Sequence, residues 1–306
     1  MPRRKQVPTT QSRPSGTHET GSSPSDGTSG GPPCCPKIRI GPSESPSRES
    51  PEAAVELLVS RGYDACELDF EGGFWLEKDD ARRFGELAAA ADIALSIHAP
   101  LPAFLGHLER DMKYQRAIGM LDHSANIARL SGARLVVIHP GFLLGRPREK
   151  ALQDVAEQLG ELGERLDKKD RLVPFGVELM GRVRELGSAE DLVWLSRQID
   201  WVRPVIDFAH LHAVTDGGMV DAEAFAGVLR RVDALLPPVA PFHIHFSDIA
   251  FANRNETKHL PYGEGTLRAE PLRQALRSFD RPATVISESP DERSHQTIRG
   301  ILKAAL

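Results

Sequence analysis

The feature that most constrains the fold of this chain is a regular alternation of short apolar runs with amphipathic helical patterns. The runs are rich in β-branched residues and recur roughly every 30 to 40 residues. The eight predicted strands are Lys37–Ser43, Ala65–Phe70, Ile93–Ala99, Arg134–Gly141, Phe175–Met180, Val202–Phe208, Pro241–Ser247 and Ala283–Ser289. Eight such β/α units predict an α/β fold, a (β/α)8 TIM barrel of about 250 residues. An open doubly wound sheet is the alternative, but it seldom needs eight units this regular.

The segments between the predicted strands carry helical signals. In Pro51–Ser60 a first-turn proline precedes an apolar stripe, and in Glu149–Leu166 leucine and valine recur near helical spacing. Ser188 followed by Asp191 resembles a capping box, although Asp is a weaker partner than Glu or Gln at that position. We therefore expect helices in these segments.

Composition divides the chain into two parts. Residues 1–36 are dominated by Ser, Thr, Gly and Pro, and such a segment cannot bury enough apolar surface to offset its ordering entropy. We expect a disordered, low-complexity leader over residues 1–36. A single TIM-barrel catalytic domain is expected over residues 37–306.

Bulk properties exclude several classes of protein. The formal net charge of −5 excludes a global positive field that would draw the chain non-specifically onto nucleic acid. No apolar run approaches the roughly 20 residues that cross a bilayer, and no secretory signal follows the basic N-terminus. Three cysteines are too few for a disulfide framework, and Cys66 sits in an apolar run, as a core residue would. We expect a cytoplasmic protein with no membrane partner.

Six of the eight predicted strands end in His, Asp or Glu. These strand-end residues are His98, His139, Glu178, Asp207 with His210, His245, and Glu288. In a parallel barrel the active site lies at the C-terminal ends of the strands, so we expect them to converge on one rim. Any one of them alone is more often structural. Together, such carboxylates and imidazoles repel one another or stay unsatisfied unless cations join them. The pattern predicts a cluster of divalent metals, and this ligand set suits zinc, manganese or iron.

The remaining histidines carry weaker signals. His243 lies two residues before His245, on the same face of its strand, and we expect it to be buried behind that ligand. His212 is expected to face solvent. Three further histidines fall in helical segments and are interpreted as structural: His107, His123 and His295.

Seven motifs, in the same order along the chain, resemble those of the endonuclease IV family, which lies within the xylose isomerase-like TIM barrels. They are Ser96–Pro100, Val137–Gly141, Val177–Glu178, Ile206–His210, His245–Asp248, His259–Gly265 and Ile286–Glu288. The likeness extends from about Lys37 to the C-terminus. Motifs spread over six strands are specific as a set, although each alone is weak. The resemblance implies a barrel with a trinuclear zinc site that cleaves the DNA phosphodiester 5′ to an abasic site.

The resemblance also implies which residues hold the metals. The implied ligands are His98, His139 and Glu178 for the first metal, Glu178, Asp207, His245 and Glu288 for the second, and His210 and His259 for the third. Two metals a few ångströms apart can share a hydroxide nucleophile, and a further metal can stabilise the leaving oxygen. On this basis Glu178 and Glu288 are the expected catalytic residues.

The sequence departs from the family pattern in three places. In the family an Asp, two residues before the position of His259, completes the third metal site, and here that position is Thr257. Glu256 is adjacent but would need a different loop path, so we expect two complete metal sites and a doubtful third. The stretch after His98 lacks the aromatic ring with which bacterial relatives probe the duplex. Phe142–Leu144 is unusually apolar for a surface that lies on DNA.

Several residues in the loops after the strands are candidates for substrate contacts. The predicted substrate-binding residues are Leu101, as an apolar wedge, together with Arg146, Arg182, Arg254 and Lys258. Basic residues on one face of an acidic protein favour contacts with phosphate groups, although ordinary solvation of loops is the alternative.

Two functions follow from these observations. The first is hydrolysis of DNA at abasic sites, in base excision repair, by a monomeric zinc-dependent hydrolase. The second is isomerisation or epimerisation of a small sugar or sugar phosphate, as in related barrels that use one or two metals. Loss of a full third site and of the aromatic probe favours the second function. The intact ligands of the first two metals favour the first.

Overall fold

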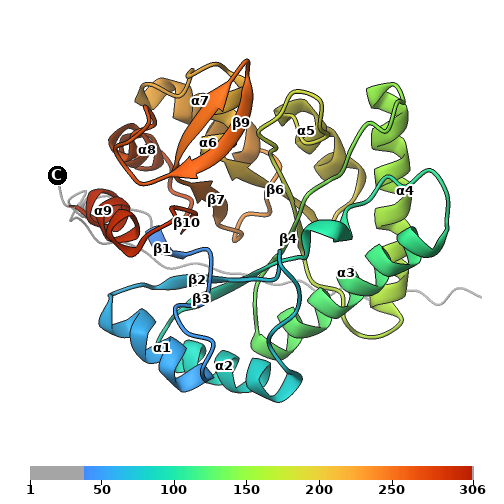
Figure 1. The fold of residues 1–306 in the computed structure, drawn as a ribbon, viewed down its shortest axis with the longest axis horizontal. Helices are drawn as coiled ribbons and strands as arrows, with labels where there is room; N and C mark the ends of the chain where they lie inside the picture. The colour runs from blue at the N-terminus through green and yellow to red at the C-terminus, as the bar shows by residue number, and fades with distance from the viewer. Residues whose placement is uncertain (1–37, 305–306) are drawn as a thin grey trace, which may run out of the picture. The chain divides into compact units, whose positions relative to one another are not determined.

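The computed structural model describes residues 38–304, and in this range eight parallel strands form a nearly closed barrel with helices outside the ring (Figure 1). The barrel strands are β1 (Ile38–Pro42), β2 (Ala65–Asp69), β3 (Ala94–His98), β4 (Val136–Ile138), β5 (Phe175–Glu178), β6 (Val202–Asp207), β7 (Phe242–Phe246) and β10 (Ala283–Ser287). Their order in the sheet is β1-β10-β7-β6-β5-β4-β3-β2. The predicted TIM barrel is therefore confirmed, with each strand inside its predicted range. The predicted leader over 1–36 lies outside the described residues.

The first and second strands approach each other closely where the ring closes. The backbone N–H of Asp64 donates to the carbonyl of Ile40 over 3.1 Å. A Cβ atom at Gly41 would lie 1.6 Å from the carbonyl oxygen of Ala65. Only glycine permits two backbones to lie this close, which explains its presence in the middle of a strand.

The helices follow the strands in the expected alternation. In the described range they are α1 (Pro51–Ser60), α2 (Lys78–Ala90), α3 (Met112–Ser131), α4 (Arg148–Asp167), α5 (Ala189–Gln198), α6 (Phe208–Val214), α7 (Ala222–Asp233), α8 (Ala269–Leu276), α9 (Glu292–Lys303) and the short 3-10 helix η1 (Leu101–Ala103). The predicted helix Pro51–Ser60 has the bounds of α1, and Ser188 and Asp191 form both bonds of a capping box at the start of α5. No helix among the described residues is long and apolar enough to cross a membrane.

An antiparallel hairpin interrupts the β/α alternation after β7. It consists of β8 (Asp248–Ala252) and β9 (Asn255–Leu260), joined by a two-residue turn at Asn253 and Arg254. Both turn residues have positive φ angles, 51° and 61°, as a type I′ hairpin turn requires. The sequence did not predict this hairpin, and it brings additional side chains to the C-terminal end of the barrel.

Alternation along the strands separates an apolar outer layer from a partly polar interior. On β7, Phe242, Ile244 and Phe246 belong to the main hydrophobic core, whereas His243 and His245 point the other way. Cys66 is buried in the same core, as the sequence predicted. Because interior residues recur every second position, each strand can place one side chain at the rim and another directly below it.

Candidate metal centre

The eight predicted metal ligands converge at one end of the barrel. They come from six barrel strands or the residues that follow them, from α6 and from β9: His98, His139, Glu178, Asp207, His210, His245, His259 and Glu288. A cavity of about 490 Å³ opens there, and six of the eight line it, whereas Asp207 and His245 are fully buried. Each of the eight belongs to a group of three or more His, Asp or Glu side chains whose N or O atoms lie within 4.8 Å of one another. The fold therefore brings all eight together.

The central group consists of Glu178, Asp207, His245 and Glu288. Nδ1 of His245 lies 3.0 Å from a carboxylate oxygen of Glu178 and 3.0 Å from one of Glu288. Oδ2 of Asp207 is buried and has no hydrogen-bond partner within residues 38–304. Buried carboxylates this close repel one another unless a cation joins them. One imidazole, three carboxylates and an unsatisfied buried oxygen fit a divalent metal.

The carboxylates of the central group differ in ionisation. Burial raises the pKa of Asp207 well above its usual range, and the charges of Glu288 and Glu178 add to that effect. Burial acts in the same direction on Glu178, but neighbouring imidazoles, led by His245, hold its pKa well below the usual range. His245 likewise lowers the pKa of Glu288 to about 2, against the effect of burial. Asp207 therefore holds its proton more tightly than its neighbours do, and a bound cation would displace that proton.

Glu178 also contacts the first predicted group. Its Oε2 lies 3.3 Å from Nε2 of His98 and 3.2 Å from Nε2 of His139, whereas its Oε1 faces His245. The carboxylate therefore lies between the first and the central group. Glu71, from the loop after β2, clusters with the two histidines and was not among the predicted residues. The rule that selected the others, a carboxylate just past the end of a strand, applies to Glu71 as well.

The third group joins His210, Glu256 and His259. Oε2 of Glu256 lies 2.6 Å from Nε2 of His210. A β-bulge beside Ala250 shifts the register of the hairpin, and this is the altered path that lets Glu256 face the cavity. Thr257, the expected position of the acidic ligand, is exposed and donates its hydroxyl hydrogen to the carbonyl of Ala250 over 3.0 Å. The third group thus has a carboxylate, and it comes from the residue before the expected position.

Hydrogen bonds on the second ring nitrogen fix the orientation of several of these histidines. His98 and His210 each place Nδ1 against a backbone carbonyl, at 3.0 and 2.8 Å. Because a carbonyl only accepts, Nδ1 of each ring carries a hydrogen. Nδ1 of His259 lies 2.6 Å from the hydroxyl of Ser247. These contacts leave Nε2 of each ring available as a ligand, which is the usual arrangement of metal-binding histidines.

Three of the five predicted substrate contacts line the cavity: Leu101, Arg182 and Lys258. Arg146 and Arg254 are not part of its lining. Arg146 donates to backbone carbonyls of the adjoining loops and forms an ion pair with Asp154. Arg254 donates to the carbonyl of Val214 at the end of α6, over 2.7 Å. These contacts tie Arg146 to backbone carbonyls and to Asp154, and tie Nε of Arg254 to one backbone carbonyl.

One wall of the cavity is apolar and aromatic. Phe104 and Phe142 line it together with Leu101, and the centroids of the two phenyl rings lie 5.1 Å apart, edge to face. Phe142 is 42% exposed. Phe104 comes from the same loop as Leu101, after β3, and Phe142 comes from the loop after β4, so two loops supply aromatic rings to the cavity. Of the apolar segment Phe142–Leu144, Phe142 lines the cavity.

Acidic side chains outside the predicted ligand set also line the cavity. Asp69 ends β2, and Glu185 lies in the loop between β5 and α5. Glu185 is buried, and its Oε2 has no hydrogen-bond partner in the described part of the chain. Burial raises the pKa of Glu185, and the positive charge of Arg182 offsets this only in part. Asp69 and Glu185 therefore add two carboxyl groups to those of the ligand groups in the lining of the cavity.

The histidines outside the ligand set occupy different environments. His243 is buried behind His245, as expected, and its Nε2 lies 3.1 Å from Oε2 of Glu67. The sequence did not single out Glu67. His212 was expected to face solvent, and this is wrong: it is buried, and its Nε2 lies 2.8 Å from the hydroxyl of Thr266. Three others belong to none of the ligand groups found among the described residues: His107, His123 and His295.

Solved structures with a similar fold include proteins of different activities. A D-tagatose 3-epimerase-like protein matches with a TM-score of 0.68 and 20% identity, over 87% of this chain and 96% of that chain. Endonuclease IV from Thermus thermophilus matches with a TM-score of 0.66 and 19% identity, over 88% of this chain and 97% of that chain. At such identities the likeness shows the fold alone.

Sequence relatives extend the comparison. An uncharacterized protein of Methanocaldococcus jannaschii is 29% identical over 246 residues, which cover 80% of this chain and 88% of the relative. A probable endonuclease 4 from Oceanobacillus iheyensis is 27% identical over 145 residues, 46% of this chain and 46% of the relative. The family described as xylose isomerase-like TIM barrel matches residues 55–305. The chain therefore belongs to the xylose isomerase-like TIM barrel family.

Proposed function

We propose that this protein is a zinc-dependent phosphodiesterase similar to endonuclease IV, which cleaves DNA 5′ to abasic sites in base excision repair. The supporting observation is that three of the four ligand groups found among the described residues contain all eight predicted ligands and adjoin a single cavity. One group of an imidazole and three carboxylates would suffice for a single metal. A single metal would not require four further imidazoles, those of His98, His139, His210 and His259. These imidazoles have a role if further metals bind.

Metals would also change the charge of the cavity. The carboxylates of the three groups would repel a phosphodiester in the metal-free protein. Three divalent ions would more than balance Glu178, Asp207, Glu256 and Glu288. Such ions lower the pKa of water towards neutrality and stabilise negative charge on a leaving oxygen. Zinc suits this mixture of imidazole and carboxylate, and manganese or iron can use the same donors.

Glu178 and Glu288 are the catalytic carboxylates of this proposal. Glu178 lies between the first and the central group. Glu288 lies 3.0 Å from Nδ1 of His245 through one oxygen and 3.8 Å from Nδ1 of His259 through the other, so it lies between the central and the third group. Glu178 would hold the ions of the first and the central group, and Glu288 would hold the ion of the central group. Neither needs to act as a free general base.

The rim of the cavity offers contacts for the phosphate groups of a damaged strand and for its sugars and bases. Lys258 is exposed and Arg182 is half-exposed, so both are available to phosphate oxygens on either side of the reacting bond. Leu101 and Phe142 present an apolar surface to a sugar or base that has lost its stacking partner.

Cleavage of a defined substrate tests the proposal. A labelled duplex with one synthetic abasic site is incubated with zinc-loaded protein, with the Glu178→Ala variant, and with Asp122→Asn, which changes a carboxylate outside the cavity lining. We expect incision on the 5′ side of the lesion by the wild type and by Asp122→Asn, and none by Glu178→Ala. An intact duplex, with protein that demonstrably holds its metals, would refute the proposal.

The acidic lining of the cavity favours a second candidate, epimerisation of a small sugar. Asp69, Glu71 and Glu185 face the cavity outside the central group, and burial raises the pKa of Glu71 as well as that of Glu185. Carboxyl groups of this kind suit hydroxyl groups better than phosphate groups. An epimerase would exchange a carbon-bound hydrogen of a ketose with solvent deuterium. Deuterium uptake in the absence of DNA cleavage would favour this candidate.

A further inference from the structure

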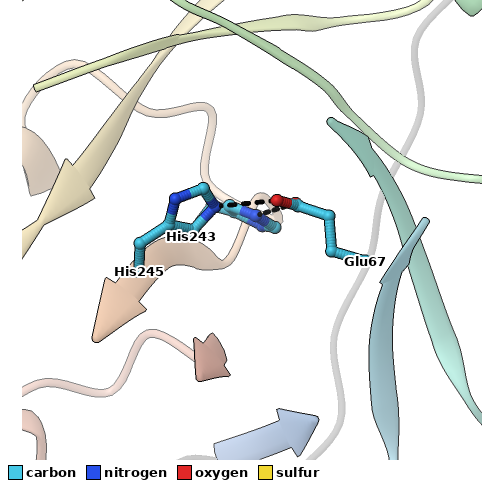
Figure 2. Close-up of side chains that lie close together, drawn as sticks. All are labelled: Glu67, His243 and His245. Atoms are coloured by element: carbon cyan, nitrogen blue, oxygen red, sulfur yellow. Dashed lines mark hydrogen bonds and ion pairs between the residues drawn. The ribbon is translucent and has the colours of Figure 1, made fainter. Parts of the chain in front are cut away.

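Below the metal groups, the barrel interior holds one fully buried carboxylate, that of Glu67 on β2. Figure 2 shows its carboxylate facing two imidazoles of β7, those of His243 and His245. Oε2 of Glu67 lies 3.1 Å from Nε2 of His243 and accepts a hydrogen bond from the hydroxyl of Ser96 over 2.6 Å. Oε1 lies 3.1 Å from Nε2 of His245. Two strands, β3 and β7, therefore direct polar groups at one side chain of β2.

Oε1 of Glu67 and Nε2 of His245 are two buried atoms in close contact, 3.1 Å apart. Neither atom has an aligned hydrogen-bond partner in residues 38–304, and both are inaccessible to solvent. A carboxylate only accepts hydrogen bonds, so it favours the tautomer of His245 that carries hydrogen on Nε2. In that tautomer the lone pair is on Nδ1, and Nδ1 is the atom that faces Glu178 and Glu288 in the central group.

We propose that Glu67 is a positioning residue for the metal centre, which selects the tautomer of His245 and aims its Nδ1 at the ion of the central group. This inference rests on the proposed metal centre. His243 and Ser96 hold the other oxygen of Glu67 and so fix the carboxylate from the side away from the metals. Carboxylates that hold the far nitrogen of a metal-binding histidine commonly contribute to metal affinity without touching the metal.

The burial of Glu67 argues against a purely structural role. A buried charge costs several kcal/mol of desolvation free energy, and apolar residues of similar size commonly stabilise an interior as well or better. The neighbouring interior positions Ala65, Ala94 and Ile286 are filled in this apolar way. A carboxylate beneath His245 is therefore better explained by what it does to that ring than by its effect on packing.

The Glu67→Gln variant tests the inference because it keeps the shape of the side chain. A glutamine has one acceptor oxygen and one donor NH2 group, so it cannot accept from both imidazoles. We expect one zinc ion to bind about 10 to 100-fold more weakly in competition with a chelator, with the other ions retained. In the cleavage assay kcat should fall while KM changes little, since Glu67 touches no DNA. The matched control is Asp122→Asn, which neutralises a buried carboxylate elsewhere and should leave zinc affinity unchanged.

The outcomes separate the inference from the proposed function. Wild-type zinc affinity in folded Glu67→Gln would overturn the role of Glu67 and leave the metal centre standing. A wild-type protein that binds no ion would overturn both. If Glu67→Gln does not fold, His243→Phe provides the second test, because it removes the anchor of Glu67 and leaves every proposed ligand in place. Unchanged zinc affinity in a folded His243→Phe protein would then overturn the inference.

Discussion

Two buried acidic sites in this barrel have opposite surroundings. Asp122, on α3, is 4% exposed and contacts Arg165 at 2.9 Å, Arg171 at 2.8 Å and the ammonium group of Lys169. Against the effect of burial, these cations lower its pKa to about 2. Asp207, at the end of β6, is fully buried, has an oxygen without a hydrogen-bond partner in the described range, and has a raised pKa.

The difference separates a structural charge from one kept for a ligand. At Asp122 the protein supplies its own cations, and the network is complete without any other molecule. At Asp207 the nearest charged groups include two further carboxylates, and the described histidines do not satisfy every oxygen. Groups with strongly perturbed ionisation in a cavity are candidates for function for this reason.

The largest expected effect is the loss of activity when Asp207 is replaced by Asn. Asp207→Asn should reduce metal-dependent activity by about a hundredfold or more, because a ligand of the central ion is lost. The metal-free protein should keep its stability, because the raised pKa of Asp207 already favours a neutral carboxyl group there and the amide of Asn is neutral as well. Chemical unfolding in excess chelator measures this. A loss of several kcal/mol there would mean that Asp207 is a structural residue like Asp122.

A comparison of two neighbouring residues in the hairpin sharpens the assignment of the third group. Glu256→Ala should lower activity by about 10 to 100-fold and release one ion, because Glu256 faces His210. Thr257→Ala should change neither, since the Thr257 side chain is exposed and bonds to backbone. Assays of activity and metal content on both variants decide the matter. Equal losses in the two variants would contradict the assignment of Glu256.

A moderate effect on stability alone is expected at Asp122. Asp122→Asn leaves Arg165, Lys169 and Arg171 facing one another without a counter-charge, and should lower the free energy of unfolding by about 1 to 3 kcal/mol. Activity per folded molecule should not change. Denaturant unfolding and the cleavage assay check the two halves of this prediction. Reduced activity in the folded variant would show that the outer network influences the cavity.

The smallest expected effect concerns the free energy of unfolding at acidic pH. The pKa of Asp122 is about 2 in the folded protein, below the value of about 4 for an unfolded Asp. The ionised form therefore stabilises the fold above pH ~4, and this contribution is lost as the pH falls from about 4 to about 2. We expect the difference in unfolding free energy between wild type and Asp122→Asn to shrink over that interval. A constant difference from pH ~5 to pH ~2 would contradict the assignment.

The sequence predicted the barrel and the convergence of the candidate ligands for one common reason. Strand and helix periodicities are local, and the rule that parallel strands direct their C-terminal ends to one rim converts strand-end residues such as His98 and Glu288 into neighbours. No knowledge of which strands pair was needed. The fold prediction failed only at the β8–β9 hairpin, where a two-residue turn at Asn253 and Arg254 was read as part of a loop.

The features that the sequence missed depend on register or on partners across the barrel. Glu256 faces the cavity because of a β-bulge, and bulges have no clear sequence signal here. Glu67 lies in the middle of a strand, and its proposed role depends on its contacts with the β7 histidines opposite it. Arg146 was expected at the rim because it follows a strand, but nearby carbonyls and Asp154 engage its guanidinium group. The folded structure determines which of several nearby partners a side chain contacts, and the sequence alone does not show this.

The number of ions per chain tests the central claim most directly. Protein saturated with zinc, freed of loosely bound metal and weighed by native mass spectrometry should carry three zinc ions per chain. The Glu256→Ala variant should carry two. A wild-type chain that holds one ion or none, with Glu256→Ala indistinguishable from it, would contradict the trinuclear centre and with it the proposed phosphodiesterase.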